Sequence, residues 1–563
     1  MSQPKYSLTF FFLLFIQTSL FAQELYLKIE GFNKKQDTTI DSLGYTKTHT
    51  DFNSLETEIK TFQDLLNSKG YIEHILLNFK RYNDSTYKAT FNIGKQYKTI
   101  KIFFEDDIDP NILNNISNSI AKNHFEIPIT EVENALNLIN NRIANFGDPF
   151  SSVQLKNIST DTNNTLKANL AVSSNRKRYI DKILIKGYDK FPISYLKHYL
   201  NIKTRQPFNL NEIKQKMQDL ENLAFASKIK DPEVLFTKDS TVLYIYVQKN
   251  KSNIFDGFLG FGTNAETNKL VFDGYLNLNL VNNLNYGESL KVNYKSDENE
   301  QRSFDINTKL PYLFKTPLGL NLNLNIFKKD SSFITVSQSA KLFYKINPRN
   351  QIGLGINSSK SNMLSEENYL INTSDFKSNF YTLDYLHTTT QTFNNLFPLN
   401  FMLNLNIGIG SRTTNQINEQ QSRFKLNTFK IFNLNDRNSF FIGIDAAYLK
   451  SKTLLENELF RFGGINSIRG FEENILTANS FSVVKTEYRH QLSTNLYIHS
   501  VVDAAYFENN ISSIDEKIFG LGFGFGLLTK AGLFKLSYAS GKTEHQSFKL
   551  SNSKLHISLS SVF

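Results

Sequence analysis

The sequence predicts three small α+β domains followed by a 16-stranded antiparallel transmembrane β-barrel. Two observations carry this fold class. A pattern of strand, helix, strand and strand recurs three times before residue 250, and strict two-residue alternation then replaces the helical period up to the chain end. A length of 563 residues also exceeds what one hydrophobic core normally organises.

The first 22 residues have the features of a cleavable signal peptide. Lys5 precedes an apolar run from Leu8 to Ile16, and the small residue Ala22 stands before Gln23. The run is shorter than the roughly 20 apolar residues of a membrane-spanning helix. No later segment approaches that length, so a membrane role of the mature chain would depend on strands.

The composition excludes several classes of function. The chain has no cysteine, which removes disulfides, thiolate zinc sites and cysteine nucleophiles. The net charge of +10 comes from Lys and Arg scattered among acidic residues, so we expect no nucleic-acid partner. The nine histidines lack metal-ligand spacing, and we expect neither a metal nor a cofactor.

Three units repeat before residue 250. Polar turns begin at 84, 163 and 239, which gives spacings of 79 and 76 residues. Each unit has an opening strand (25–29, 97–103 and 179–185), an amphipathic helix (54–66, 130–143 and 210–223) and a closing strand (87–93, 166–172 and 242–247). The order and size resemble the polypeptide-transport-associated (POTRA) domain, in three copies at 23–95, 96–177 and 178–250. Generic α/β modules remain the alternative.

Residues 251–563 alternate with a period of two, as in 320–326, 401–410 and 519–525. The candidate strands are near ten residues long, with an apolar face opposite Asn, Gly or Ser. Soluble sandwiches use shorter strands, whereas transmembrane barrels match this pattern. About 16 candidates are present. The last one places Leu555, Ile557, Leu559 and Phe563 on one face, which Ser561 interrupts.

A glycine-rich segment lies between the eleventh and twelfth candidate strands. It contains Gly463, Gly464, Ile468, Arg469, Gly470 and Phe471, and five candidate strands follow it, at 480–491, 496–507, 518–528, 531–540 and 553–563. This segment resembles the superfamily of outer-membrane assembly factors that includes BamA and TamA. In that superfamily a long extracellular loop folds back into the barrel, and its tip carries an arginine, a glycine and an aromatic residue.

The resemblance implies that Arg469 pairs with an acidic residue on the second strand after the loop, where Asp503 stands. Glu487 and Arg489, on the strand directly after the loop, would join the network. The alternation supports this independently, because Ile498 and Val502 share one parity and Asp503 has the other, which faces the lumen.

The resemblance also implies a location and a role. We expect an outer-membrane barrel with periplasmic POTRA domains that capture unfolded outer-membrane or exported polypeptides by β-augmentation. Clients would enter the lipid at a weak seam between the strand at 254–264 and the strand at 555–563, since Gly257, Gly260 and Gly262 weaken the former.

Two alternatives remain open: a two-partner-secretion translocator of one dedicated protein, and a passive channel. Three repeats without a plug helix after Gln23 favour assembly, in a layout like that of TamA. The sequence does not identify the client, a periplasmic or inner-membrane partner protein, or the oligomeric state.

The sequence contains no complete catalytic motif. Gly541-Lys542-Thr543 lacks the first glycine of a phosphate loop, because position 536 is Leu536. The glycines at 257, 260 and 262 precede no helix, which a dinucleotide-binding turn needs. We therefore expect no enzymatic activity.

Overall fold

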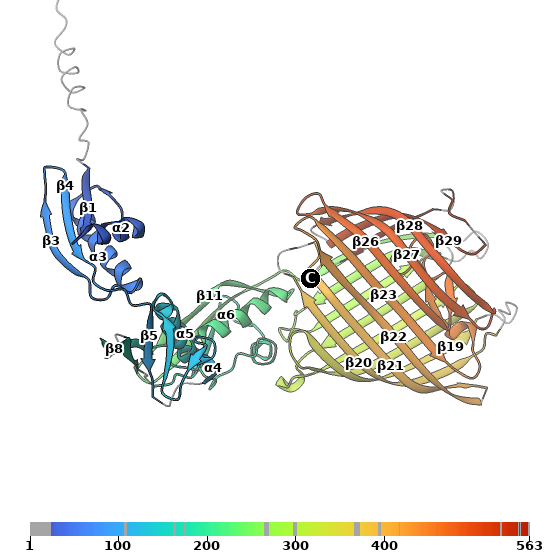
Figure 1. The fold of residues 1–563 in the computed structure, drawn as a ribbon. Helices are drawn as coiled ribbons and strands as arrows, with labels where there is room; N and C mark the ends of the chain where they lie inside the picture. Colours follow the sequence, from blue (N-terminus) through green and yellow to red (C-terminus); the bar gives the residue numbers. More distant parts are fainter. Residues whose placement is uncertain are drawn as a thin grey trace, which may run out of the picture. The chain divides into compact units, whose positions relative to one another are not determined.

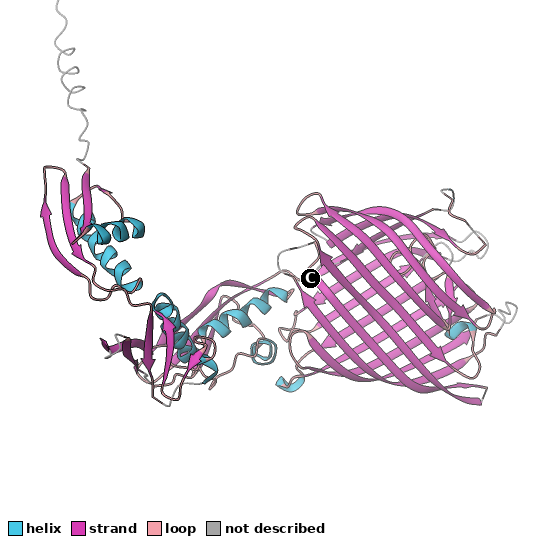
Figure 2. Ribbon diagram, viewed as in Figure 1, coloured by secondary structure: helices cyan, strands magenta, loops and turns pink. Residues whose placement is uncertain are grey.

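The computed structural model describes residues 24–105, 110–160, 165–173, 176–263, 270–296, 301–364, 372–391, 394, 396–415, 417–529, 532–545, 547–549, 551 and 553–560. The expected signal peptide therefore lies outside the described residues. Helix is concentrated in the N-terminal domains, and the C-terminal part of the chain is built of strands (Figure 1, Figure 2).

The first domain is a four-stranded sheet in the order β2-β1-β4-β3 with two helices. Ile40 from the first helix and Phe62 from the second are completely buried with Phe91 of the sheet. Asp51 begins the longer helix, where its carboxylate accepts a hydrogen bond from the Ser54 backbone N–H at 2.7 Å. The elements are β1 (Leu25–Gly31), α2 (Lys34–Leu43), β2 (Thr48–His49), α3 (Phe52–Ser68), β3 (Ile75–Arg81) and β4 (Thr86–Asn92).

The second and third domains keep this plan. Their sheets have the orders β6-β7-β5-β9-β8 and β10-β12-β11. The second contains β5 (Thr99–Phe103), α4 (Pro110–Leu113), β6 (Ser119–Ile120), β7 (His124–Pro128), α5 (Val132–Asn145), β8 (Ser152–Thr160) and β9 (Leu166–Ser173). The third contains β10 (Lys182–Lys186), a helical turn at Tyr195–Tyr199, α6 (Leu210–Gln218), β11 (Ala226–Phe236) and β12 (Thr241–Lys249).

One strand arrangement is common to all three domains. The opening strand lies parallel to the closing strand, as β1 to β4, β5 to β9 and β10 to β12. The strand before the closing one, β3, β8 or β11, pairs with it antiparallel and forms an edge of the sheet. The predicted threefold order of strand, helix, strand and strand is confirmed. The short elements α2, β6 and β7 were not predicted.

Sixteen of the remaining strands form one antiparallel sheet in sequence order, which curls into a barrel (Figure 1). Its strands are β13 (Ile254–Thr263), β14 (Leu270–Val281), β15 (Ser289–Ser296), β16 (Arg302–Leu310), β17 (Leu318–Lys329), β18 (Phe333–Lys345), β19 (Asn350–Met363), β20 (Phe376–Thr390), β21 (Leu399–Thr414), β22 (Ile417–Asn433), β23 (Asn438–Lys450), β26 (Ser480–Gln491), β27 (Leu496–Asn509), β28 (Ile514–Thr529), β29 (Gly532–Lys542) and β30 (Lys554–Ser560). The predicted count of 16 is confirmed.

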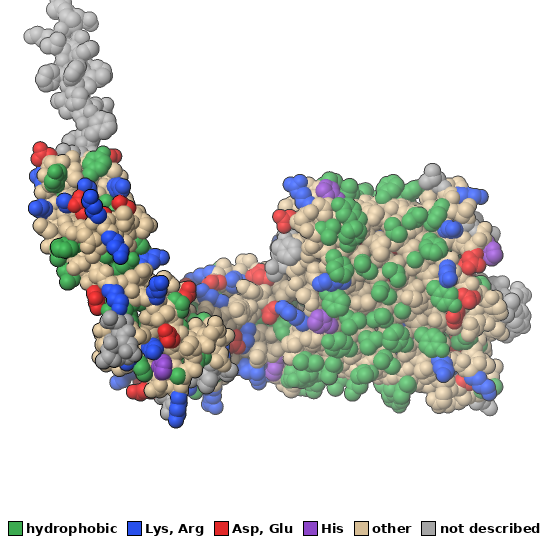
Figure 3. All heavy atoms as spheres, in the orientation of Figure 1, with side chains coloured by type: hydrophobic (Ala, Val, Ile, Leu, Met, Phe, Trp, Pro, Cys, Tyr) green, Lys and Arg blue, Asp and Glu red, His purple; other side chains and the backbone are tan. Residues whose placement is uncertain are grey.

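The outer wall of the barrel is apolar. Figure 3 shows a broad band of hydrophobic side chains across the visible wall, with charged side chains gathered towards the two ends. Exposed members of this band include Leu354, Tyr381, Leu383, Ile409, Phe523 and Ile557. Such a band is what a lipid-facing strand surface requires. Within the described ranges, no helix combines the length and apolar content needed to cross a bilayer.

Candidate functional site

The long segment between β23 and β26 contains a small hairpin of its own, formed by β24 (Phe460–Phe462) and β25 (Leu476–Ala478). Phe462 stacks on Phe481 of the barrel wall, with ring centroids 4.6 Å apart. Ile468 is fully buried in the same apolar cluster. The segment is therefore packed against the inner side of β26 and β27.

Paired glycines make the turn after β24 possible. Gly463 and Gly464 have φ angles of +112° and +92°, a region that residues with a side chain rarely adopt. A Cβ on Gly463 would also lie 2.6 Å from the carbonyl oxygen of Glu472. The backbone can therefore reverse here and bring the tip, Arg469–Phe471, against the wall.

Arg469 is bound to Asp503 through three hydrogen bonds. Its backbone N–H and its Nε donate to Oδ2 at 3.0 and 2.7 Å, and Nη2 donates to Oδ1 at 2.5 Å. Both side chains are at most 1% exposed. Burial alone would lower the pKa of the Arg469 guanidinium, but hydrogen bonds and charge attraction from Asp503 and Glu487 outweigh burial and raise it. The guanidinium is therefore held in its charged form.

Glu487 of β26 joins three cations. Arg469 Nη1 forms an ion pair with its Oε1, Lys535 Nζ of β29 lies 2.5 Å from the same oxygen, and Arg489 Nε lies 2.7 Å from Oε2. With Asp503, the cluster contains three positive and two negative groups. Each buried charge thus has an opposite partner, which is the condition for tolerating charge away from bulk water.

Arg489 is held on its other sides by aromatic rings that the sequence did not single out. Its guanidinium lies 4.3 Å from the ring centroid of Phe441 and 4.5 Å from that of Phe397. Cation–π contacts of this kind position a guanidinium without neutralising it. Sequence patterns predict neither Lys535 nor Phe397 as part of the site, because contacts between strands far apart in the chain leave no local pattern.

The tip also contacts the last strands of the barrel. The Gly470 backbone N–H donates to His556 Nε2 of β30 at 3.0 Å. A Cβ on Gly470 would lie 2.5 Å from the backbone N of Gly541, and one on Gly520 would lie 2.1 Å from the carbonyl oxygen of Arg469. The expected network of Arg469, Asp503, Glu487 and Arg489 is thus brought together and extended to β30.

Two family models match the sequence. The model of the Omp85 superfamily domain matches residues 282–563, half of the chain. The chain belongs to the Omp85 superfamily. The second model, POTRA, described as a surface antigen variable number repeat, matches residues 178–250. An Omp85 barrel preceded by POTRA domains indicates an outer-membrane protein with its POTRA domains in the periplasm.

Two solved structures of CdiB share the fold of this Omp85 protein. CdiB from Acinetobacter baumannii is 18% identical, with 90% of this chain and 97% of that chain covered and a TM-score of 0.52. CdiB from Escherichia coli is 12% identical, with 89% and 97% covered and a TM-score of 0.52. BamA from Haemophilus ducreyi lacking POTRA domains 1–3 is 15% identical, with 81% and 97% covered and a TM-score of 0.47. No curated protein matches the sequence.

The expected seam residues lie on the first and last strands of the Omp85 barrel. Gly257, Gly260 and Gly262 belong to β13, which pairs with β14. Leu555 and Ile557 of β30 are exposed on the lipid side. Leu559 pairs with Phe534 of β29, and Phe563 lies outside the described residues.

Proposed function

We propose that this Omp85 protein inserts unfolded polypeptides into the outer membrane, with the POTRA domains capturing clients and a seam between β13 and β30 releasing them into lipid. Members of the superfamily are transport and assembly proteins, which gives the general role. The observation that carries the proposed route is the hydrogen bond from Gly470 to His556, because it joins the loop tip to the last strand.

The tip bridges two neighbouring wall strands, β26 and β27, and the last strand, β30. Arg469 is fixed to β26 and β27 through Glu487 and Asp503. Its neighbour Gly470 bonds β30, which as described has only seven residue pairs with β29. β13 contains three glycines, at 257, 260 and 262, and glycine lowers strand stability because it has no side chain to pack. Movement of the tip would therefore release β30 at the seam.

The POTRA edges supply places for client capture. The pairing of each edge strand is interrupted by a β-bulge or irregularity, and the residues left out of the pairing include one exposed aliphatic residue: Leu77 in β3, Ile158 in β8 and Ile229 in β11, each 50–51% exposed. A bulge interrupts the regular edge, so a client strand would pair beside it. The exposed side chain then adds apolar contact, and both contributions tolerate many client sequences.

A disulfide across the seam tests the route. The chain contains no cysteine, so two introduced cysteines are the only thiols. The first cysteine is placed in turn at each position of 255–261, and the second at each position of 555–559. Variants whose two cysteines form a disulfide are reconstituted in liposomes. We expect oxidation to slow insertion of an unfolded barrel client, measured by protease protection, and a reductant to restore it.

The matched control places cysteines at Leu536 and Ile557, which are paired residues of β29 and β30. Locking two strands that already neighbour each other leaves the seam free, so this variant should insert clients equally well in both redox states. Undiminished insertion with a fully oxidised seam pair would rule the route out. Secretion of a client to the far side under that condition would favour passage through the lumen.

A further inference from the structure

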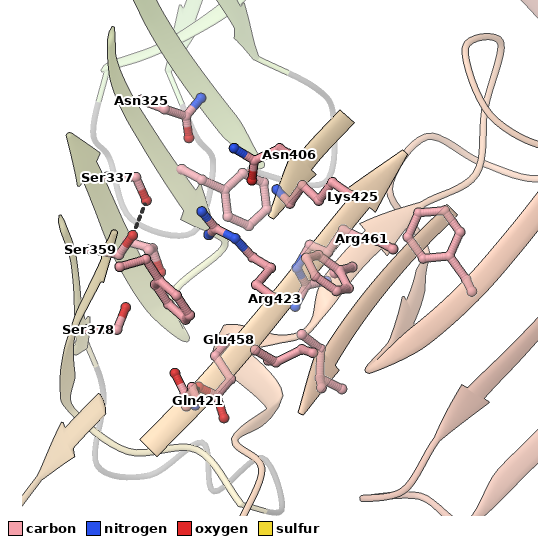
Figure 4. Close-up of a pocket in the computed structure, with 18 of the residues that line it drawn as sticks. Asn325, Ser337, Ser359, Ser378, Asn406, Gln421, Arg423, Lys425, Glu458 and Arg461 are labelled. Atoms are coloured by element: carbon pink, nitrogen blue, oxygen red, sulfur yellow. Dashed lines mark hydrogen bonds between the residues drawn. The ribbon is translucent and has the colours of Figure 1, made fainter. Parts of the chain in front are cut away.

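The lumen contains a second cluster of cations, separate from the one around Arg469. A cavity of about 760 Å³ lies between the barrel wall and the inserted loop (Figure 4). Asn and Ser side chains line much of it, including Asn325, Ser337 and Asn406. Arg423 and Lys425 of β22 and Arg461 of β24 line it as well, so both the wall and the loop contribute positive charge.

The acidic side chains of this cavity are already engaged by other cations. Asp384 lies 2.5 Å from Lys341 Nζ, and Asp445 lies 2.7 Å from Lys485 Nζ. Glu458 forms an ion pair with Arg412. None of these acids forms an ion pair with a cation of the cluster, although Asp384 attracts Arg423 from a distance, and Glu456 and Asp330 attract Arg461 in the same way.

Each of the three cations lies beside an aromatic ring. Arg423 lies 4.6 Å from the Phe380 ring centroid, Lys425 lies 5.2 Å from that of Phe460, and Arg461 lies 5.5 Å from that of Phe333. In the described part of the chain, the side chain of none of the three donates a hydrogen bond or forms an ion pair. Two shielded nitrogens, Arg423 Nε and Arg461 Nη2, have no acceptor there.

We propose that Arg423, Lys425 and Arg461 form an oxyanion-binding site inside the lumen. Guanidinium groups bind carboxylate and phosphate oxygens in a forked geometry, and aromatic faces hold the cations in place without cancelling their charge. Lys341 and the three cations of the cluster line the cavity together with three acids, and an excess of one sign of charge concentrates counter-ions. A bound anion would tie Arg461 of the loop to β22 of the wall, so its binding would stabilise the docked loop.

Two sources carry this chemistry: free phosphate, and the acidic side chains of a polypeptide inside the lumen. The test uses the full chain in detergent micelles and measures the thermal unfolding midpoint of the barrel. Inorganic phosphate and a hexaglutamate peptide are titrated separately against chloride at equal ionic strength. A ligand that binds the folded state raises the midpoint in a saturable way. The probe that raises the midpoint at the lower concentration identifies the source of the bound anion.

Three variants decide the outcome. R423Q/K425Q/R461Q should abolish the rise, and R461Q alone, which leaves the barrel strands intact, should weaken binding at least tenfold. K430Q is the matched control, because Lys430 lies on the same strand with opposite parity and should leave the rise unchanged. The absence of a saturable rise with both probes, or an equal rise in R461Q, would overturn the proposal.

Discussion

Arg469 carries a positive charge into a part of the wall where two carboxylates are buried. Its guanidinium and backbone donate four hydrogen bonds, three to Asp503 and one to Glu487. The next residue, Gly470, donates one more, to His556. Removing one partner of such a cluster leaves the opposite charges buried without compensation. The free-energy cost of that loss exceeds the net stabilisation that the intact pair provides.

Arg469→Ala should therefore undock the loop and leave the barrel folded. The loss of a buried partner destabilises by about 3–5 kcal/mol. The measurement is the rate of protease cleavage in the segment between β23 and β26, alongside the thermal midpoint of the barrel. Arg437→Ala, in an exposed turn, is the control and should leave cleavage unchanged. Equal cleavage in the two variants would show that Arg469 does not hold the loop.

Gly520→Ala tests the close approach of the tip to β28. The added Cβ would meet the Arg469 carbonyl oxygen at 2.1 Å, so the tip must shift. Overpacking of this kind typically destabilises by about 1–3 kcal/mol. Gly408→Ala of β21, whose Cβ would meet only side-chain atoms and none closer than 3.4 Å, should change little. The free energy of unfolding of both variants is measured by chemical denaturation. Equal values would argue against a tightly docked tip.

At the residue scale, the sequence predicted those contacts that leave a local signal. Asp503 was placed in the lumen by the parity of Ile498 and Val502, and the structure places it against Arg469. Lys535 and His556 were missed, since the loop tip reaches strands far from it in sequence. His556 alternates with two lipid-facing residues, so its inward position was readable although its partner was not.

At the scale of elements, the three edge strands share a feature that periodicity alone does not reveal. The bulges in β3, β8 and β11 depend on pairing with the neighbouring strand, and the exposed aliphatic residues look like ordinary strand positions in the sequence. The helices and closing strands were predicted to within a few residues because each has a buried face. The unpredicted β6 and β7 are too short for a clear pattern.

Substituting the three bulge residues tests their part in client capture. The triple variant Leu77→Lys, Ile158→Lys and Ile229→Lys should weaken binding of an unfolded client several-fold while the domains stay folded, because all three side chains are already half-exposed. Binding is measured by fluorescence anisotropy of a labelled client peptide.

The matched control carries one lysine per domain away from the sheet edges: Phe32→Lys, Leu138→Lys and Ile193→Lys, all at exposed apolar positions. It should bind the client like the unmodified protein. If both triple variants lose affinity equally, general surface hydrophobicity and not the edge strands captures clients.

At the scale of the whole molecule, polarity is divided between the two sides of one sheet. The outer wall is apolar, and the lumen holds the charged clusters and the inserted loop. A client that follows the proposed route would therefore contact the outer surface only at β13 and β30. A client that passes through the lumen would leave that surface untouched.

Photocrosslinking of a client arrested during insertion tests this most directly. A photoreactive residue is placed at Leu555 of β30 or at Tyr381 of β20, which are 59% and 71% exposed on the lipid side, and a third is placed at the lumen residue Asn406. The seam route predicts client adducts at Leu555 and none at Tyr381. Adducts at Asn406 alone, or equal adducts at Leu555 and Tyr381, would contradict it.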